Sequence, residues 1–113
     1  MITGQLDGRK RRLKVEVKSE LTGTLTQPLR EGISQLKKEH PEDAWDALYL
    51  DVRNARVIDS MGLNWLLAES RSLREKDKEF VIRVASPAIN RVLEFARFDK
   101  IATIKYRRRR QLR

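Results

Sequence analysis

The sequence predicts an α/β fold, with its elements in the order β-β-α-β-α-β-α-β and a mixed, mostly parallel sheet with helices packed against it. After an opening pair of strands, single apolar segments of strand length alternate with single amphipathic segments of helical spacing. Strands that are joined through one helix pair in parallel through right-handed crossovers. The length of 113 residues suits one domain with one core.

The first two strands are expected to form a hairpin. Asp7-Gly8 is a turn signal, and segment 13–17 after it alternates apolar with charged residues, which is typical of a half-buried strand. The sheet is therefore expected to begin with one antiparallel pair.

The first helix is predicted to begin at Gln27-Pro28, because proline suits the first helical turn and holds the preceding residue out of the helical region. Its apolar stripe is Leu29, Ile33 and Leu36, and it should end before Pro41. Segment 47–52 follows as a strand of apolar and β-favouring residues.

The second half of the chain repeats this alternation. After Asp59-Ser60, leucines recur near helical spacing as far as the charged run 74–78, and segment 80–84 is the next strand. Ser86-Pro87 is a strong helix start, with serine as the cap and proline in the first turn. Segment 101–104 is short and β-branched and is predicted to be the last strand.

The net charge of +9 is concentrated in two runs. Segment 9–12 carries four positive charges, and segment 105–113 carries six and no acid, so the rest of the chain is close to neutral. We expect a folded domain over residues 1–104 and a basic, disordered tail over 105–113. The tail is either simply solvated or binds an acidic partner or anionic lipid, through a basic patch of Arg107, Arg108, Arg109 and Arg110.

The composition argues against an enzyme. His40 is the only histidine, so no catalytic dyad or triad that needs one can form, and the five glycines form no phosphate-binding fingerprint. We expect no cofactor and no metal, and we interpret the acidic residues of segment 39–46 as solvated surface. Trp45 and Trp65 could be an exposed recognition pair, although packing is favoured for Trp65. The absence of cysteine and of an apolar leader favours a cytoplasmic protein.

The candidate functional site is the junction Asp59-Ser60-Met61-Gly62, where a predicted strand gives way to a helix. Parallel α/β proteins place their sites at this edge of the sheet. Unpaired N–H groups at the helix start would partly stabilise a phosphoryl group on Ser60, while Asp59 would repel its charge. Gly62 would let the backbone of another protein approach closely. The same residues also fit a plain helix cap, worth about 1 kcal/mol, so the pattern leaves both interpretations open.

The surroundings of this junction resemble the core motif of STAS domains, a family that includes the bacterial anti-sigma factor antagonists. The match is Leu48-Tyr49-Leu50-Asp51-Val52-Arg53-Asn54-Ala55-Arg56-Val57-Ile58-Asp59-Ser60-Met61-Gly62-Leu63. In the family, a hydrophobic strand ends in an acid, and Asp-Ser-Ser-Gly-Leu or Asp-Ser-Thr-Gly-Leu opens a helix. Downstream, segments 80–84, 86–93 and 98–101 look like the region of the third helix, and Ser19-Glu20-Leu21-Thr22 resembles a variant of Gly-Glu-Leu-Asp.

This resemblance implies a non-enzymatic phospho-switch in which Ser60 is the phosphoacceptor. The kinase would be an anti-sigma factor of the histidine-kinase-like ATPase type, which binds the unphosphorylated protein, and a PP2C-type phosphatase would remove the phosphate. The implied partner surface comprises Thr22, Asp59, Ser60, Met61, Gly62 and Asn64. Met61 replaces the second hydroxyl residue of the motif, Thr22 replaces an acid, and Asn64 stands where a small residue is common, so the partner is expected to be a specialised one.

Two alternatives remain. The chain could be a constitutive STAS adaptor subunit of a lipid-transport ATPase or signalling complex, in which the same helix docks permanently. It could also bind nucleic acid through the arginines of the tail, in which case affinity should fall steeply with salt.

Overall fold

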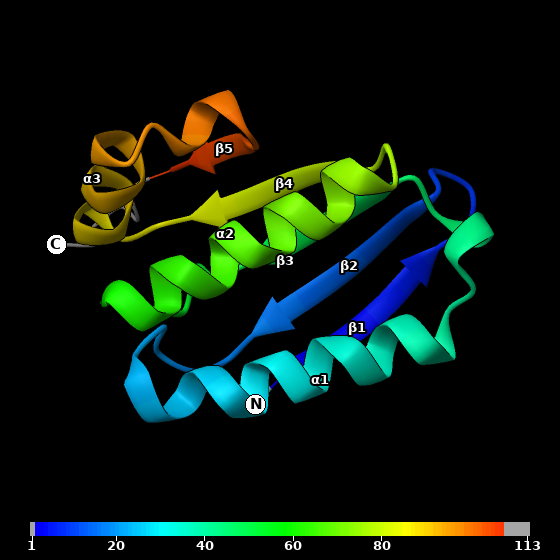
Figure 1. Cartoon of the computed structure of the whole chain (residues 1–113), viewed down its shortest axis with the longest axis horizontal. Helices are drawn as coiled ribbons and strands as arrows, with labels where there is room; N and C mark the ends of the chain where they lie inside the picture. Colours follow the sequence, from blue (N-terminus) through cyan, green and yellow to red (C-terminus); the bar gives the residue numbers. More distant parts are fainter. Residues whose placement is uncertain (1, 108–113) are drawn as a thin grey trace, which may run out of the picture.

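The computed structural model describes residues 2–107, and its elements follow the predicted order (Figure 1). The strands are β1 (Ile2–Asp7), β2 (Arg12–Val17), β3 (Ala47–Asp51), β4 (Glu79–Val84) and β5 (Thr103–Tyr106). The helices are α1 (Thr26–Glu39), α2 (Ser60–Glu75) and α3 (Pro87–Phe95), with short 3-10 turns η1 (Gly23–Leu25), η2 (Glu42–Ala44) and η3 (Phe98–Lys100).

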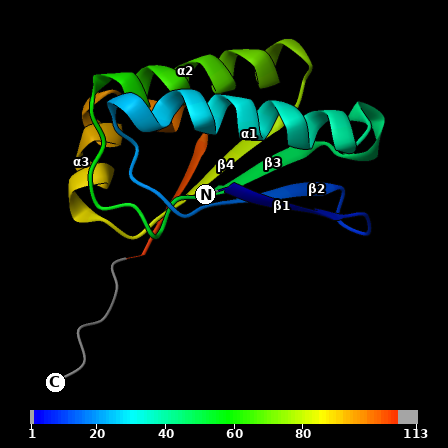
Figure 2. The same cartoon turned by 90° about the horizontal axis from the view of Figure 1, so that it is seen from below.

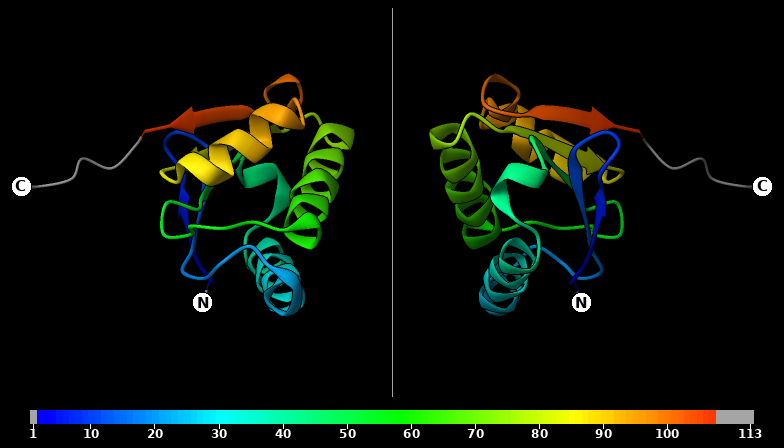
Figure 3. Two further views of the ribbon diagram at one scale, coloured as in Figure 1. Left: turned by 90° about the vertical axis from the view of Figure 1, so that its left-hand side faces the viewer. Right: turned by 90° about the vertical axis from the view of Figure 1, so that its right-hand side faces the viewer.

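The five strands form one sheet in the order β1-β2-β3-β4-β5. β1 pairs with β2 in the antiparallel sense, and every later pair is parallel, which confirms the predicted fold class. The helices α1 and α2 lie side by side over one face (Figure 2), and an end-on view shows the sheet curving around all three helices (Figure 3). Among residues 2–107 no helix lies on the opposite face of the sheet, the uncovered face (Figure 2).

The core lies between the sheet and the helices. Alternate residues of each inner strand point into it, for example Leu13 on β2, Leu48 on β3 and Phe80 on β4, which stand next to one another in the register. Trp45 and Trp65 are each only 1% exposed and belong to the same core. The alternative of an exposed tryptophan pair is therefore wrong, and the favoured packing of Trp65 is confirmed.

The last strand begins later than predicted. Ile101 and Ala102 close η3 by donating their N–H groups to the Phe98 carbonyl at 3.0 Å each, so the chain reaches the sheet only at Thr103. The parallel register with β4 then brings Lys105 and Tyr106 into the strand. The predicted segment 101–104 is corrected to Thr103–Tyr106, because hydrogen bonding to β4 outweighs the composition of the segment.

The acidic segment between α1 and β3 forms surface ion pairs. Glu42 pairs with Lys76, and the Asp46 carboxylate lies 2.7 Å from the Arg11 guanidinium. These partners lower the pKa of both acids. Within residues 2–107 no cluster of histidine, cysteine or acidic side chains could hold a metal ion. No helix in that range is long and apolar enough to cross a membrane.

Candidate functional site

The Asp59 carboxylate joins two segments at the start of α2. Its Oδ1 accepts a hydrogen bond from the Gly62 N–H at 3.0 Å, which caps the helix, and its Oδ2 accepts one from the Gly23 N–H at 2.8 Å. These backbone donors, Gly23 foremost, lower the pKa of Asp59. The ionised side chain therefore fixes α2 to the loop that connects β2 with α1.

Ser60 is the first residue of α2 and its side chain is exposed. The amides expected to be free around it are partly occupied, because Gly62 donates to the Asp59 side chain and Leu63 donates to the Asp59 carbonyl at 2.9 Å. The expectation that the remaining N–H groups at this helix start partly stabilise a phosphoryl group on Ser60, while Asp59 repels its charge, stays a prediction.

Gly62 is needed for a contact inside the chain. It is buried, and a Cβ at this position would lie 2.0 Å from the carbonyl oxygen of Leu21. Leu21 runs parallel to Ile58 in an isolated bridge, in which the Asp59 N–H donates to the Leu21 carbonyl at 3.1 Å. The expectation that the space serves a partner's backbone is corrected, because the chain's own loop fills it.

Two further side chains hold the loop that leads from β3 to Ser60. The Glu20 Oε1 accepts hydrogen bonds from the N–H groups of Arg56 at 2.7 Å and Val57 at 2.9 Å. The Ser86 hydroxyl donates to the Arg56 carbonyl at 2.8 Å and also caps α3. The sequence predicted the Ser86 cap but not the role of Glu20. The available signal for Glu20 was its position next to Leu21 in the motif of residues 19–22.

The exposed surface around Ser60 combines apolar and polar groups. Met61 is 53% exposed and Val57 is 49% exposed, although both are apolar. Beside them lies a groove of about 460 Å³ between α1 and α2, lined by Gly23, Thr24, Thr26, Gln27, Arg30, Met61 and Asn64. The structure therefore brings Met61 and Asn64 together with the η1 turn.

Thr22 immediately precedes the η1 turn. It is half-buried, and its backbone carbonyl accepts from the Leu25 N–H at 2.9 Å, while its side chain makes no capping hydrogen bond. Thr22 is thus near the groove without lining it.

The basic patch predicted for the tail is only partly described. Arg107 follows β5, is exposed, and donates its N–H to the Val84 carbonyl at 2.9 Å. Arg108, Arg109 and Arg110 lie outside the described residues. Of the other basic run, residues 9–11 lie in the β1–β2 turn and Arg12 begins β2, at the opposite end of the parallel strands (Figure 1).

The comparisons with known proteins agree with the geometry. The family model of the STAS domain matches residues 5–110. Among solved structures, the unphosphorylated form of the anti-sigma factor antagonist SpoIIAA superposes with a TM-score of 0.70 at 15% identity, over 92% of this chain and 87% of that one. An anti-sigma factor antagonist from Mycobacterium paratuberculosis superposes with a TM-score of 0.67 at 24% identity, over 93% of this chain and 86% of that one. No curated protein matches the chain.

Proposed function

Because this chain belongs to the STAS domain family, we propose that it is a non-enzymatic switch that binds an anti-sigma factor kinase through the surface around Ser60. The observation that carries the proposal is an exposed hydroxyl on the first residue of α2, beside a carboxylate held ionised by two backbone donors. The family match and the likeness in fold to anti-sigma factor antagonists support it.

Phosphorylation would act by charge. A kinase of the histidine-kinase-like ATPase type transfers the γ-phosphoryl group of ATP to the Ser60 oxygen, ADP leaves, and the hydroxyl proton is released. The product carries about −1.5 to −2 at neutral pH. Because Asp59 is fixed next to it, the two charges add at one point of the surface, and a partner that docks on Met61 loses its fit. A PP2C-type phosphatase would restore the binding form by hydrolysis.

The test is phosphorylation by the cognate anti-sigma kinase with ATP, followed by mapping of the phosphate by mass spectrometry. We expect one phosphate, on Ser60, and none on Ser60→Ala. The kinase should co-purify with the wild type and with Ser60→Ala but not with Ser60→Asp. Phosphate elsewhere, or none, would refute the proposal.

A constitutive adaptor is the second candidate, and the exposed Met61 and Val57 favour it. Two apolar side chains about half exposed on either side of Ser60 suit a permanent interface better than a reversible one. In that case Ser60→Ala and Ser60→Asp would both retain the partner, whereas Met61→Glu would lose it. Release by Ser60→Asp alone excludes the adaptor.

A further inference from the structure

The uncovered face of the sheet carries an aromatic side chain near its centre. Lys14, Tyr49 and Val81 are neighbours across β2, β3 and β4, and all three alternate with core residues, so they belong to the uncovered face. Val81 is nevertheless only 2% exposed. Neighbouring side chains therefore cover Val81.

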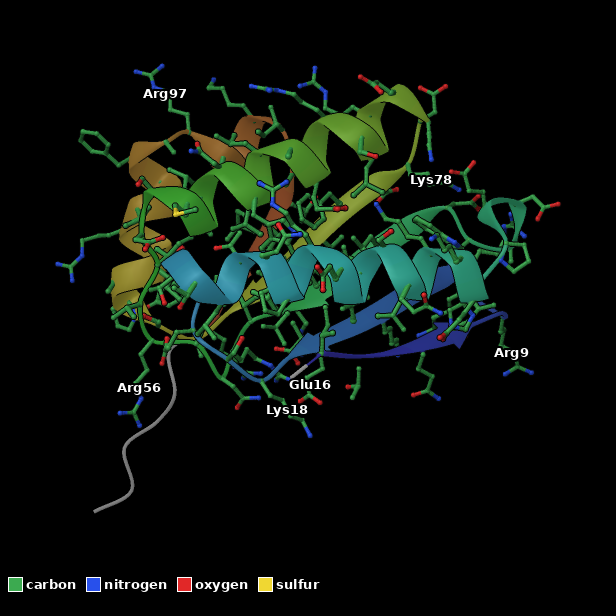
Figure 4. All side chains as sticks on the ribbon, turned by 60° about the horizontal axis from the view of Figure 1, so that its bottom comes forward. Arg9, Glu16, Lys18, Arg56, Lys78 and Arg97 are labelled. Atoms are coloured by element: carbon green, nitrogen blue, oxygen red, sulfur yellow. The ribbon has the colours of Figure 1, made fainter. Side chains whose placement is uncertain are left out.

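Basic side chains from different strands surround this ring. The Arg12 guanidinium lies 4.5 Å from the ring centre, and the Lys105 ammonium lies 5.9 Å from it. Lys14 and Arg83 line the hollow next to Tyr49. The side chain of Lys18, just after β2, points away from the helices together with that of Glu16 (Figure 4). An arginine side chain over an aromatic ring offers a surface on which a nucleobase stacks.

The hollow beside Tyr49 has a volume of about 300 Å³ and contains hydrogen-bonding groups of both kinds. Gln5 and Thr3 on β1 form one side of it, and Glu16 and Asp51 contribute carboxylates. Asp51 is already held by the Arg53 guanidinium at 2.8 Å, whereas the one ion pair of Glu16 within residues 2–107 is with the Lys18 ammonium, at 3.8 Å. A carboxylate in this position accepts a hydrogen bond from a base amino group.

From this geometry we propose that the uncovered face binds single-stranded nucleic acid. One base stacks on the Tyr49–Arg12 pair, Glu16 accepts from its amino group, and the flanking phosphates meet Lys14, Arg83 and Lys105. The proposal accounts for basic side chains that the Ser60 surface does not use, namely Lys14, Arg83 and Lys105. A duplex is a poorer ligand, because its bases are already stacked on one another.

The test is fluorescence anisotropy of a labelled twelve-nucleotide single-stranded RNA of mixed sequence with the full chain, repeated at several salt concentrations. Binding should weaken as salt rises. Tyr49→Leu should weaken it about tenfold or more, and Tyr49→Phe should restore it to within about twofold, because stacking needs only the ring. Arg12→Gln and Lys105→Gln should each reduce the salt slope by about 0.7 to 1.

The control is Arg71→Gln, which removes the same charge from the exposed surface of α2. It should leave both the affinity and the salt slope nearly unchanged. A variant with Arg108, Arg109 and Arg110 replaced by Gln should bind more weakly and still respond to Tyr49→Leu. Thermal melting confirms that each variant is folded.

Three outcomes would overturn the proposal: no RNA binding at low salt, equal affinity of Tyr49→Leu and the wild type, or loss of all response to Tyr49 once the tail arginines are replaced. Binding to phosphatidylserine vesicles without binding to RNA also counts against it. None of these outcomes bears on Ser60, so the two proposals fail or stand separately.

Discussion

At the residue scale, Asp59 and Gly62 determine how Ser60 is presented. The Asp59 carboxylate joins Gly23 to the start of α2, and Gly62 admits the Leu21 carbonyl into the same corner. Both residues hold the backbone on either side of Ser60. The backbone around the exposed Ser60 is therefore fixed from both sides.

The capping role of Asp59 predicts a pH-dependent stability. Because the folded-state pKa of Asp59 is lowered, its contribution is fully present above the unfolded pKa of about 3.9 and is lost as pH falls through the folded value. Above about pH 5, Asp59→Asn should have a lower melting temperature than the wild type. The difference should disappear as pH falls below about 4. Asp99→Asn, a change at an exposed acid, is the control, and a pH-independent gap for Asp59→Asn would contradict the prediction.

The close contact at Gly62 predicts a large effect of one methyl group. Gly62→Ala should lower the free energy of unfolding by about 2 kcal/mol, because the backbone of Leu21 has to move. Urea denaturation measures this free energy of unfolding. Gly8→Ala is the matched control, since a Cβ there meets no atom within 4 Å, and it should change stability by less than about 0.5 kcal/mol. Equal effects at the two positions would show that the Leu21 contact is unimportant.

At the scale of elements, the ends of the helices were the most predictable features. Ser86 caps α3 through its hydroxyl, as expected from Ser86-Pro87, and α1 ends at Glu39, before Pro41. These signals are local and need no tertiary information. The start of β5 was predicted two residues early, because its register depends on β4 and on the η3 turn.

The C-terminal end of α3 offers a stabilising substitution. Arg97 follows the helix with φ of 55°, in the left-handed region, and its side chain points into solvent (Figure 4). Arg97→Gly should raise the free energy of unfolding by about 0.5 to 1 kcal/mol, because glycine adopts this backbone without a side-chain clash.

The control lies inside the same helix. Arg91→Gly removes an identical side chain at a position with helical backbone, so it should lower the stability by about 1 kcal/mol. Chemical denaturation of the two variants should thus give effects of opposite sign. A loss of stability in both would refute the argument from backbone conformation.

At the scale of the whole molecule, one buried core connects α1, α2 and α3 with the strands β2, β3 and β4. Trp45 before β3 and Trp65 in α2 belong to this core, and the indole N–H of each lacks a hydrogen-bond partner among the described residues. Replacing either by phenylalanine therefore breaks no hydrogen bond and leaves a single fluorescent probe in a different part of the molecule.

This shared core predicts a single unfolding transition. In urea, the fluorescence of Trp45→Phe and that of Trp65→Phe should each change at the same midpoint as the circular dichroism of the same variant. Separate midpoints for fluorescence and circular dichroism in one variant would show that the region of its remaining tryptophan unfolds by itself.

Sequence patterns sufficed to predict the order of the elements, the antiparallel start, the helix caps and the place of Ser60 at the beginning of a helix. These follow from periodicities and turn signals within a few residues of one another. Tertiary structure alone decided that Leu21 fills the space at Gly62, that Glu20 holds the loop before Ser60, and that Arg12 and Lys105 meet over Tyr49. Each of those contacts joins residues more than thirty positions apart, and such pairs depend on strand register and loop geometry, which only the assembled sheet fixes.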